Sequence, residues 1–147
     1  MGQSFKLEKF IPYRLMVAAE TVSMGFSVTY KEQFGMSRPE WRVLASLAQL
    51  QHATAKDIAA HSSMHKTKVS RAVFELEKRK WLLRKLDETD RRMEHLSLTK
   101  AGVAVHAKLV VHATAYQAKL LALLGLKTSD QLLTMLNKLE GLHADHW

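Results

Sequence analysis

A cluster of positively charged side chains lies in the segment MHKTKVSRAV, residues 64–73. Four residues that can bind an anion stand close together there: His65, Lys66, Lys68 and Arg71. At helical spacing these residues lie on one side of a helix, and the apolar residues of the segment lie on the other. A charged helix face is often only solvated, so the neighbouring segments must show whether this face binds a partner.

The charge of the chain is concentrated around this cluster. The 147 residues carry a formal net charge of +8 with a sequence pI near 9.8. Residues 65–100 contain eleven Lys and Arg against six Asp and Glu, and therefore five of the eight net positive charges. A local excess of this kind indicates a polyanionic partner, with nucleic acid the first candidate and an anionic membrane the second.

Residues for other chemistry are sparse. The chain has no cysteine, so disulfides and thiolate metal sites are excluded, and a reducing compartment fits. Its eight histidines include pairs at 106 and 112 and at 143 and 146, but none converges at the spacing of three or four metal ligands. Phosphate-binding glycine loops, nucleophile elbows and zinc-protease motifs are absent from the sequence. We therefore expect no enzyme, no cofactor and no metal site.

The elements around the cluster begin with two helices. Residues 8–33 are predicted to form a long helix that tolerates Pro12 near its start and ends at Gly35. Ser37 and Glu40 have the spacing of a capping box, so a second helix is predicted to begin there and to run to about residue 50. Its apolar face is predicted from the spacing of Trp41, Leu44, Leu47 and Ala48.

A third, short helix is predicted over residues 55–61, with Thr54 as its N-cap and Asp57 in its first turn. Ser62 and Ser63 end it, and the charged segment then begins a helix that reaches about residue 79. Two helices joined by such a short turn are typical of a helix-turn-helix.

Two short strands follow, WLLRKL over residues 81–86 and MEHLSL over residues 93–98. The second shows partial alternation through Met93, Leu96 and Leu98. Between the strands lies DETDRR, residues 87–92, a polar tip with two arginines. A helix-turn-helix followed directly by a β-hairpin predicts a winged helix, and this order of elements is more specific than either part.

The last third of the chain is apolar. Thr99 is predicted to cap a long helix over residues 101–124 that Gly125 ends, and Ser129 to begin another with Leu132, Leu136 and Leu139 in one stripe. Lys108 and Lys119 interrupt the long helix, so we expect no membrane span, and the N-terminus lacks the apolar core of a signal peptide. We expect a soluble, cytoplasmic homodimer formed through apolar helices at both ends of the chain.

The whole pattern resembles the MarR family of bacterial transcription regulators. Four segments carry the resemblance, in this order and spacing: EWRVLASL (40–47), MHKTKVSRAVFELEKRKWL (64–82), DETDRR (87–92) and LSLTKAG (96–102). It implies a mainly α-helical (α+β) chain in which residues 1–147 form a single MarR-type domain. The winged helix-turn-helix would occupy about 37–99, and the dimerisation helices about 8–34 and 100–147.

The resemblance also implies a function. Members of this family bind a pseudo-palindromic operator as homodimers, usually repress, and are released by a small molecule, often an aromatic acid. Two residues depart from the family pattern. Lys80 replaces a common glycine, so either it adopts the left-handed conformation at a cost of about 1 kcal/mol or the helix ends differently. Phe74 replaces a residue that is often polar.

A recognition helix reads base edges from its N-terminal part while cations nearby bind phosphates. Base edges and adjacent phosphates are therefore assigned to Thr67, Lys68, Ser70 and Arg71. Lys66 and His65 are expected to face the DNA backbone. In the wing, Arg91 or Arg92 is expected to enter the minor groove, with Asp90 orienting an arginine, and Arg84 and Lys85 to support the backbone contact. Asp87 and Glu88 fit exposed ion pairs of little value.

The ligand pocket implied by the resemblance lies between the dimer helices and the winged helix. In this sequence that region offers Tyr13, Arg14, Met16, Met24, Trp41 and Arg42. The arginines could pair with a carboxylate, and an aromatic carboxylate or its coenzyme A thioester is the expected effector. The same aromatic and Met residues could equally be core, and the arginines surface ion pairs.

Four alternatives stay open at this point. The protein could be an activator, a DNA-binding regulator without a ligand, a metal-responsive regulator, or a basic protein that binds nucleic acid or membrane without sequence preference.

Overall fold

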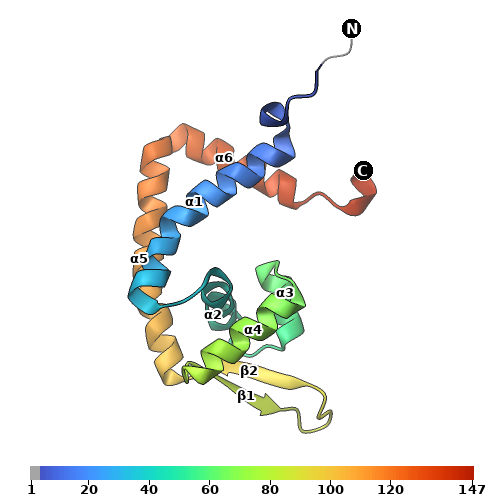
Figure 1. Ribbon diagram of the computed structural model, residues 1–147, viewed down its shortest axis with the longest axis vertical. Helices are drawn as coiled ribbons and strands as arrows, with labels where there is room; N and C mark the ends of the chain where they lie inside the picture. Colours follow the sequence, from blue (N-terminus) through green and yellow to red (C-terminus); the bar gives the residue numbers. More distant parts are fainter. Residues whose placement is uncertain (1–3) are drawn as a thin grey trace. The chain divides into compact units, whose positions relative to one another are not determined.

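The computed structural model describes residues 4–147 and divides the chain into two compact units, which meet at Val110 and Val111. The first unit contains a short 3-10 helix, a long helix, a three-helix cluster and a β-hairpin (Figure 1). Their bounds are η1 Leu7–Lys9, α1 Ile11–Phe34, α2 Arg38–Leu50, α3 Ala55–Ser62, α4 Lys66–Lys78, β1 Leu82–Leu86 and β2 Glu94–Leu98. These elements confirm the predicted mainly helical winged helix.

The boundary between α1 and α2 is formed by the residues that the sequence indicated. Gly35 ends α1 with a φ of 62°, a left-handed conformation that glycine adopts without steric cost. The Ser37 hydroxyl accepts a hydrogen bond from the Glu40 amide, and the Glu40 carboxylate accepts one from the Ser37 amide. This capping box fixes the first turn of α2.

The turn between α3 and α4 is equally well defined. Thr54 and Asp57 form a second capping box at the start of α3, and hydrogen bonds from the Thr54 amide and hydroxyl hold the pKa of Asp57 below its ordinary value. Ser63 ends α3 in the left-handed conformation with a φ of 52°. Asn, Asp and other small polar residues visit this region more easily than bulky ones.

The core of the first unit lies where α2, α3, α4 and the hairpin meet. Its most completely buried aliphatic side chains include Val43, Leu44, Leu47, Ile58, Val69, Leu76, Leu82 and Leu96. They come from every element of the winged helix, so the apolar face of α4 is held against α2 and α3 and its opposite face is left to solvent. Ile58 of α3 and Val69 and Ala72 of α4 are all buried where these two helices pack.

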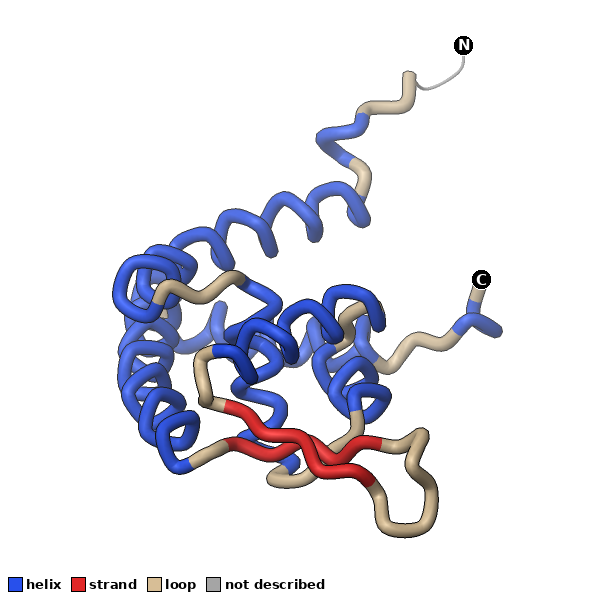
Figure 2. Tube along the Cα trace, turned by 60° about the horizontal axis from the view of Figure 1, so that its bottom comes forward, coloured by secondary structure: helices blue, strands red, loops and turns tan. Residues whose placement is uncertain are grey.

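The wing is an antiparallel hairpin in which β1 and β2 pair from Leu82 opposite Leu98 to Leu86 opposite Glu94. Figure 2 shows the two strands and the loop that joins them. A pair of backbone hydrogen bonds between Ala53 and Leu96 fastens β2 to the segment before α3. The predicted alternation holds for Leu96, which is buried, but Met93 lies outside the strand and is 42% exposed.

The wing is connected to the helices at two positions where the backbone geometry restricts the residue type. Lys80 adopts a φ of 63°, so the first of the two outcomes expected for this position is the one observed. Gly102, in the first turn of α5 (Lys100–Leu124), lies so close to Trp81 that an added Cβ would stand 2.0 Å from the Trp81 carbonyl oxygen. Thr99 caps α5 as predicted, accepting a hydrogen bond from the Gly102 amide.

The second unit contains the rest of α5 and α6 (Leu126–Glu140), followed by a 3-10 helix at Ala144–His146. Gly125 separates the two helices with a φ of 80° and is itself the N-cap of α6. The expectation that Ser129 begins this helix is therefore wrong. Ser129 lies inside α6, where its hydroxyl donates to the Leu121 carbonyl and ties α6 to the end of α5.

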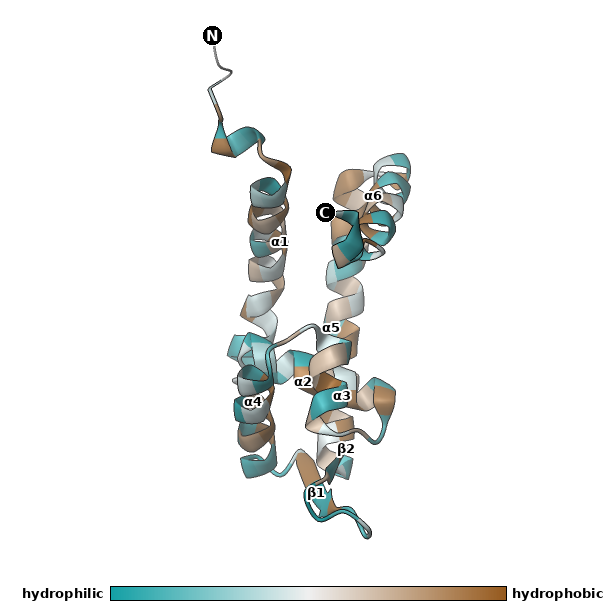
Figure 3. Ribbon diagram, turned by 90° about the vertical axis from the view of Figure 1, so that its right-hand side faces the viewer, coloured by the Kyte–Doolittle hydropathy of each residue, from teal (hydrophilic) through white to brown (hydrophobic). Residues whose placement is uncertain are grey.

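Hydrophobic residues occur along these helices (brown in Figure 3), and several of them are exposed. Val103, Val111 and Leu123 of α5 are 56%, 68% and 77% exposed. In residues 4–147, no single helix meets the length and hydropathy requirements of a membrane span. The bent pair of α5 and α6 meets them only when its two helices are taken together.

Candidate nucleic-acid interface

The outward face of α4 carries the side chains that the sequence assigned to DNA. Six residues at its N-terminal end are exposed: His65, Lys66, Thr67, Lys68, Ser70 and Arg71. They lie opposite the buried Val69, Ala72 and Val73, as the periodicity predicted. The structure therefore brings these residues together on one accessible surface.

The first turn of α4 is set by a histidine. His65 is the N-cap residue, and its ring Nδ1 accepts a hydrogen bond from the Thr67 amide at 3.2 Å. This ring nitrogen therefore caps the helix, and the expected contact of His65 with the DNA backbone stays a prediction. The remaining free amides of the first turn and the helix dipole make this end of α4 attractive to an anion.

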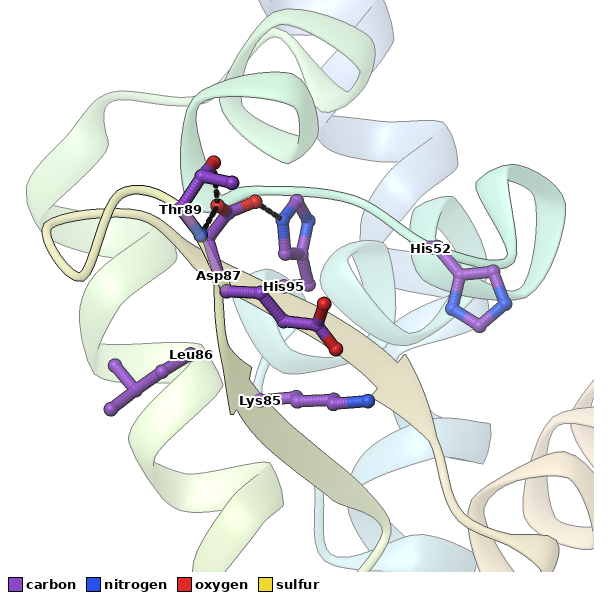
Figure 4. A pocket seen from close by; sticks show the side chains of 7 residues that line it. His52, Lys85, Leu86, Asp87, Thr89 and His95 are labelled. Carbon is purple, nitrogen blue, oxygen red and sulfur yellow. Dashed lines mark hydrogen bonds and ion pairs between the residues drawn. The ribbon is translucent and has the colours of Figure 1, made fainter.

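The wing tip is organised by Asp87, for which the sequence offered only an exposed ion pair. One carboxylate oxygen accepts hydrogen bonds from the Thr89 amide and hydroxyl and from the Asp90 amide, at 2.7–2.9 Å. The other oxygen lies 2.7 Å from His95 Nε2 (Figure 4). These contacts, the bond to His95 first, hold the pKa of Asp87 well below its usual range. One carboxylate therefore links the wing turn to β2.

The two wing arginines differ in their surroundings. Asp90 accepts hydrogen bonds from the Arg92 amide at 3.0 Å and from its Nε at 3.3 Å. The predicted contact in which Asp90 orients an arginine therefore exists, and the arginine that Asp90 contacts is Arg92. The Arg92 side chain is 93% exposed. Arg91 is exposed beside it.

Arg84 forms ion pairs with two carboxylates of the protein itself. Its Nε lies 2.6 Å from Glu77 of α4, and its Nη1 lies 2.7 Å from Glu94 of β2. The two carboxylates, Glu94 first, raise the pKa of Arg84 further. Arg84 thus links the wing to α4, whereas Lys85 is exposed on β1 next to the Asp87 cluster.

A groove of about 630 Å³ runs between α4 and the wing, and the sequence did not indicate it. Cationic side chains from four segments line it: Lys56, Lys66, Arg84 and Arg92. The side chains of Phe74 and Met93 form an apolar part of the groove lining. Lys56 had no recognisable signal, and Phe74 was indicated only as a departure from the family pattern, because their contribution depends on how α3, α4 and the wing pack together.

Arg79, at the end of α4, is a second residue that sequence reasoning missed. Its guanidinium donates hydrogen bonds to the carbonyls of Phe34 and Gly35, the former at 2.7 Å. It also lies 3.5 Å from the Glu40 carboxylate and over the Trp81 ring, 5.0 Å from its centroid. One side chain therefore connects α1, α2, the end of α4 and the residue that precedes β1.

The six candidate ligand residues are not gathered by the first unit. Tyr13 and Met24 are eleven residues apart on α1, which separates them by about 16 Å along the helix axis. Met16 and Met24 are 55% and 61% exposed. Trp41 packs against Phe26 and Tyr30 as part of an aromatic cluster, with ring centroids 5.2 and 6.3 Å away.

The arginines of that set also differ in place. Arg14 is exposed on α1, and Arg42 is half-buried on α2. The ion pair that joins these helices is instead Arg38 with Glu20, at 2.8 Å, and it lowers the pKa of Glu20. Among residues 4–147 no three His, Cys, Asp or Glu side chains are grouped so that they could hold a metal ion.

Comparisons with known proteins agree with this arrangement. The model of the MarR family matches residues 34–93, the span from the end of α1 to the wing tip. A search of curated proteins finds no match. Among solved structures, the MarR family transcriptional regulator SPO1453 from Silicibacter pomeroyi is 28% identical with a TM-score of 0.77, and the match covers 92% of this chain and 99% of that one.

Two further structures share the fold at lower identity. BpsR of Bordetella bronchiseptica, whose DNA binding is regulated by 6-hydroxynicotinic acid, is 17% identical with a TM-score of 0.85 over 96% of this chain and all of that one. NadR, in complex with 4-hydroxyphenylacetate, is 19% identical with a TM-score of 0.75 over 97% and 99%. The family model on the winged helix and these structures along nearly the whole chain support a MarR family regulator, and members of that family are DNA-binding transcriptional regulators and not enzymes.

Proposed function

We propose that this regulator is a repressor that binds a pseudo-palindromic operator as a homodimer and is released by an aromatic carboxylate or its coenzyme A thioester. The observation that carries the proposal is the exposed N-terminal face of α4. Thr67, Lys68, Ser70 and Arg71 stand free of the core there, beside a wing that presents Arg91 and Arg92. Base-reading side chains flanked by cations fit duplex DNA better than a membrane surface.

Each side chain has a role in this proposal. Arg71 and Lys68 pair with guanine O6 and N7, and Thr67 and Ser70 serve neighbouring bases. Lys66 and Lys85 contact phosphates. Arg92, oriented by Asp90, enters the minor groove, where narrow A·T-rich DNA has its most negative potential.

The homodimer is supported by the unpartnered apolar surface of the terminal helices. On α1, Ile11, Met16 and Met24 are 66%, 55% and 61% exposed, and on α6 Leu126 is 88% exposed. Isolated soluble chains rarely leave this many large apolar side chains in water along several helices. A two-fold dimer would cover them and place two copies of α4 opposite two half-sites about one helical turn apart.

The effector class rests on the structural relatives. The ligands named for BpsR and NadR are both aromatic carboxylates. The contacts of such a ligand would be drawn from Tyr13, Arg14, Met16, Met24, Trp41 and Arg42, with Arg14 or Arg42 as the partner of its carboxylate. The ligand would act by favouring a dimer whose recognition helices no longer match the half-sites.

The deciding experiment is a fluorescence-anisotropy titration against the DNA upstream of the protein's own gene, in competition with a scrambled fragment at near-physiological salt. Binding to the native fragment about a thousandfold tighter is expected for a specific regulator. Equal and steeply salt-dependent binding to both fragments would replace the proposal by general polyanion binding. Reporter transcription with and without the protein gives the sign of regulation.

A further inference from the structure

Phe74 has no structural reason to be aromatic within its own fold. It is 56% exposed, and it lies about 150° around α4 from the centre of the buried face formed by Val69, Ala72, Val73 and Leu76. The ring therefore adds nothing to the core, and a large apolar side chain on an otherwise polar and cationic helix face requires another explanation.

The position of Phe74 is that of a reading residue. It stands one turn after Ser70 and Arg71 on the same outward face, about 4–6 Å further along the helix axis. Lys78 Nζ lies 5.8 Å from the ring centroid, so a cation accompanies the ring at the end of this face.

Phe74 also forms the apolar part of the groove between α4 and the wing. Lys66 and Ser70 border it on α4, and Met93 and Arg92 face it from the wing. Arg84 is paired with Glu77 and Glu94, but the other three cations of the groove, Lys56, Lys66 and Arg92, are complementary to a phosphate chain. DNA bound on α4 would therefore have one backbone along the groove and base edges at its α4 side. An apolar ring at that border needs an apolar group on the base edge.

We propose that Phe74 contacts the C5-methyl group of a thymine in each operator half-site, and thereby makes this regulator select thymine at that position. The methyl group is the one apolar feature that a base pair shows in the major groove, and Phe is among the residues that contact it. This inference rests on the proposed operator binding, and it names Phe74 as one residue that determines the sequence specificity of that binding.

The test uses the full-length protein and an operator obtained by selection from a random duplex library. Each thymine of the selected site is replaced in turn by deoxyuridine, which removes only the methyl group and keeps all hydrogen-bonding edges. We expect one position in each half-site at which deoxyuridine weakens wild-type binding by about fourfold, the effect of one buried methyl group. In Phe74→Ala the thymine and deoxyuridine operators should bind equally.

The controls separate reading from folding. Phe74→Leu keeps an apolar contact and should retain part of the thymine preference. Leu83→Ala removes an exposed apolar side chain of β1, 44% exposed and not part of the groove lining, and should leave the preference unchanged. Because Phe74 is exposed, both of its variants should fold, and circular dichroism checks this.

Three outcomes overturn the inference. A Phe74→Ala variant with the wild-type preference for thymine would exclude the ring as the reader, as would a site at which deoxyuridine has no effect at any position. If selection enriches no sequence at all, operator binding itself fails and the role of Phe74 fails with it, so the two failures are distinguished at the first step.

Discussion

His95 Nε2 of β2 lies 2.7 Å from the carboxylate of Asp87, at the opposite end of the wing turn. The same carboxylate accepts hydrogen bonds from the Thr89 amide (Figure 4) and from the Asp90 amide, so it closes the loop that carries both wing arginines. The position of Arg92 thus depends on a residue that itself need not touch DNA. Each prediction below concerns one such contact.

Asp87→Asn should make stability less dependent on pH. The pKa of Asp87 is lowered by folding from its ordinary value of 3.8, so its ionised form stabilises the fold above that pH and this stabilisation is lost as pH falls toward the folded value. Urea unfolding between about pH 6 and about pH 3 should therefore give a steeper decline for wild type than for the variant. Glu88→Gln is the control, and parallel curves for wild type and Asp87→Asn would contradict the assignment.

Arg84 and Arg92 should respond differently to substitution. Arg84→Met removes two partly exposed ion pairs and should lower the free energy of unfolding by about 1 kcal/mol, with little change in the salt dependence of DNA binding. Arg91→Ala combined with Arg92→Ala should leave stability nearly unchanged and lower the slope of log affinity against log salt, by about 0.9 per lost phosphate contact. A lower slope in Arg84→Met would instead restore the direct phosphate contact expected from the sequence.

Arg71→Ala should cost about 1–3 kcal/mol of binding on the cognate operator and relax base preference at one position. The reason is that a guanidinium pairs with two acceptors of a single guanine. Titration of a set of operators with single base changes gives the measurement. Equal losses on every sequence would make Arg71 a phosphate contact.

Lys80→Gly should raise the free energy of unfolding by about 1 kcal/mol. Lys80 occupies the left-handed region with a φ of 63°, where a side chain is strained and glycine is not. Lys80→Ala removes the same side chain beyond Cβ and keeps the strain, so it should not be stabilised. Chemical denaturation of the three proteins decides, and equal stability of both variants would show that the gain has another source.

Gly102→Ala should be among the most destabilising substitutions, by about 3 kcal/mol or more, because the new methyl group would collide with the Trp81 backbone. Neither backbone segment can yield easily, since Thr99 bonds to both sides of this junction through Lys80 and Gly102. The neighbouring Val103→Ala, at a position 56% exposed, should change stability by less than about 0.5 kcal/mol. A well-folded Gly102→Ala would mean that α5 can move away from the wing.

The sequence was sufficient for the elements with local signals. Gly35, the capping box of Ser37 and Glu40, and the cap at Thr54 each depend on residues within one helical turn, and all were predicted correctly. Ser129 was misread because its hydroxyl could equally cap a new helix or bond back to Leu121, and only the geometry after Gly125 decides between them.

The candidate site also has one part that local sequence patterns predict and another part that they do not. The charged face of α4 follows from periodicity alone, so its exposed residues could be predicted. The roles of Asp87 and Arg79 depend on His95 and Gly35, partners eight and forty-four residues away in the chain, and no local pattern contains them. The groove containing Phe74 is likewise a product of packing between α3, α4 and the wing.

The contacts of Arg79 have a mechanical consequence. From the C-cap of α4, its guanidinium donates hydrogen bonds to the carbonyls of Phe34 and Gly35, the last residue and the C-cap of α1. The C-terminal end of α1 can therefore move away from the end of α4 only if both of these hydrogen bonds break. Arg79 thus couples the position of the long N-terminal helix to that of the helix with the exposed cationic face.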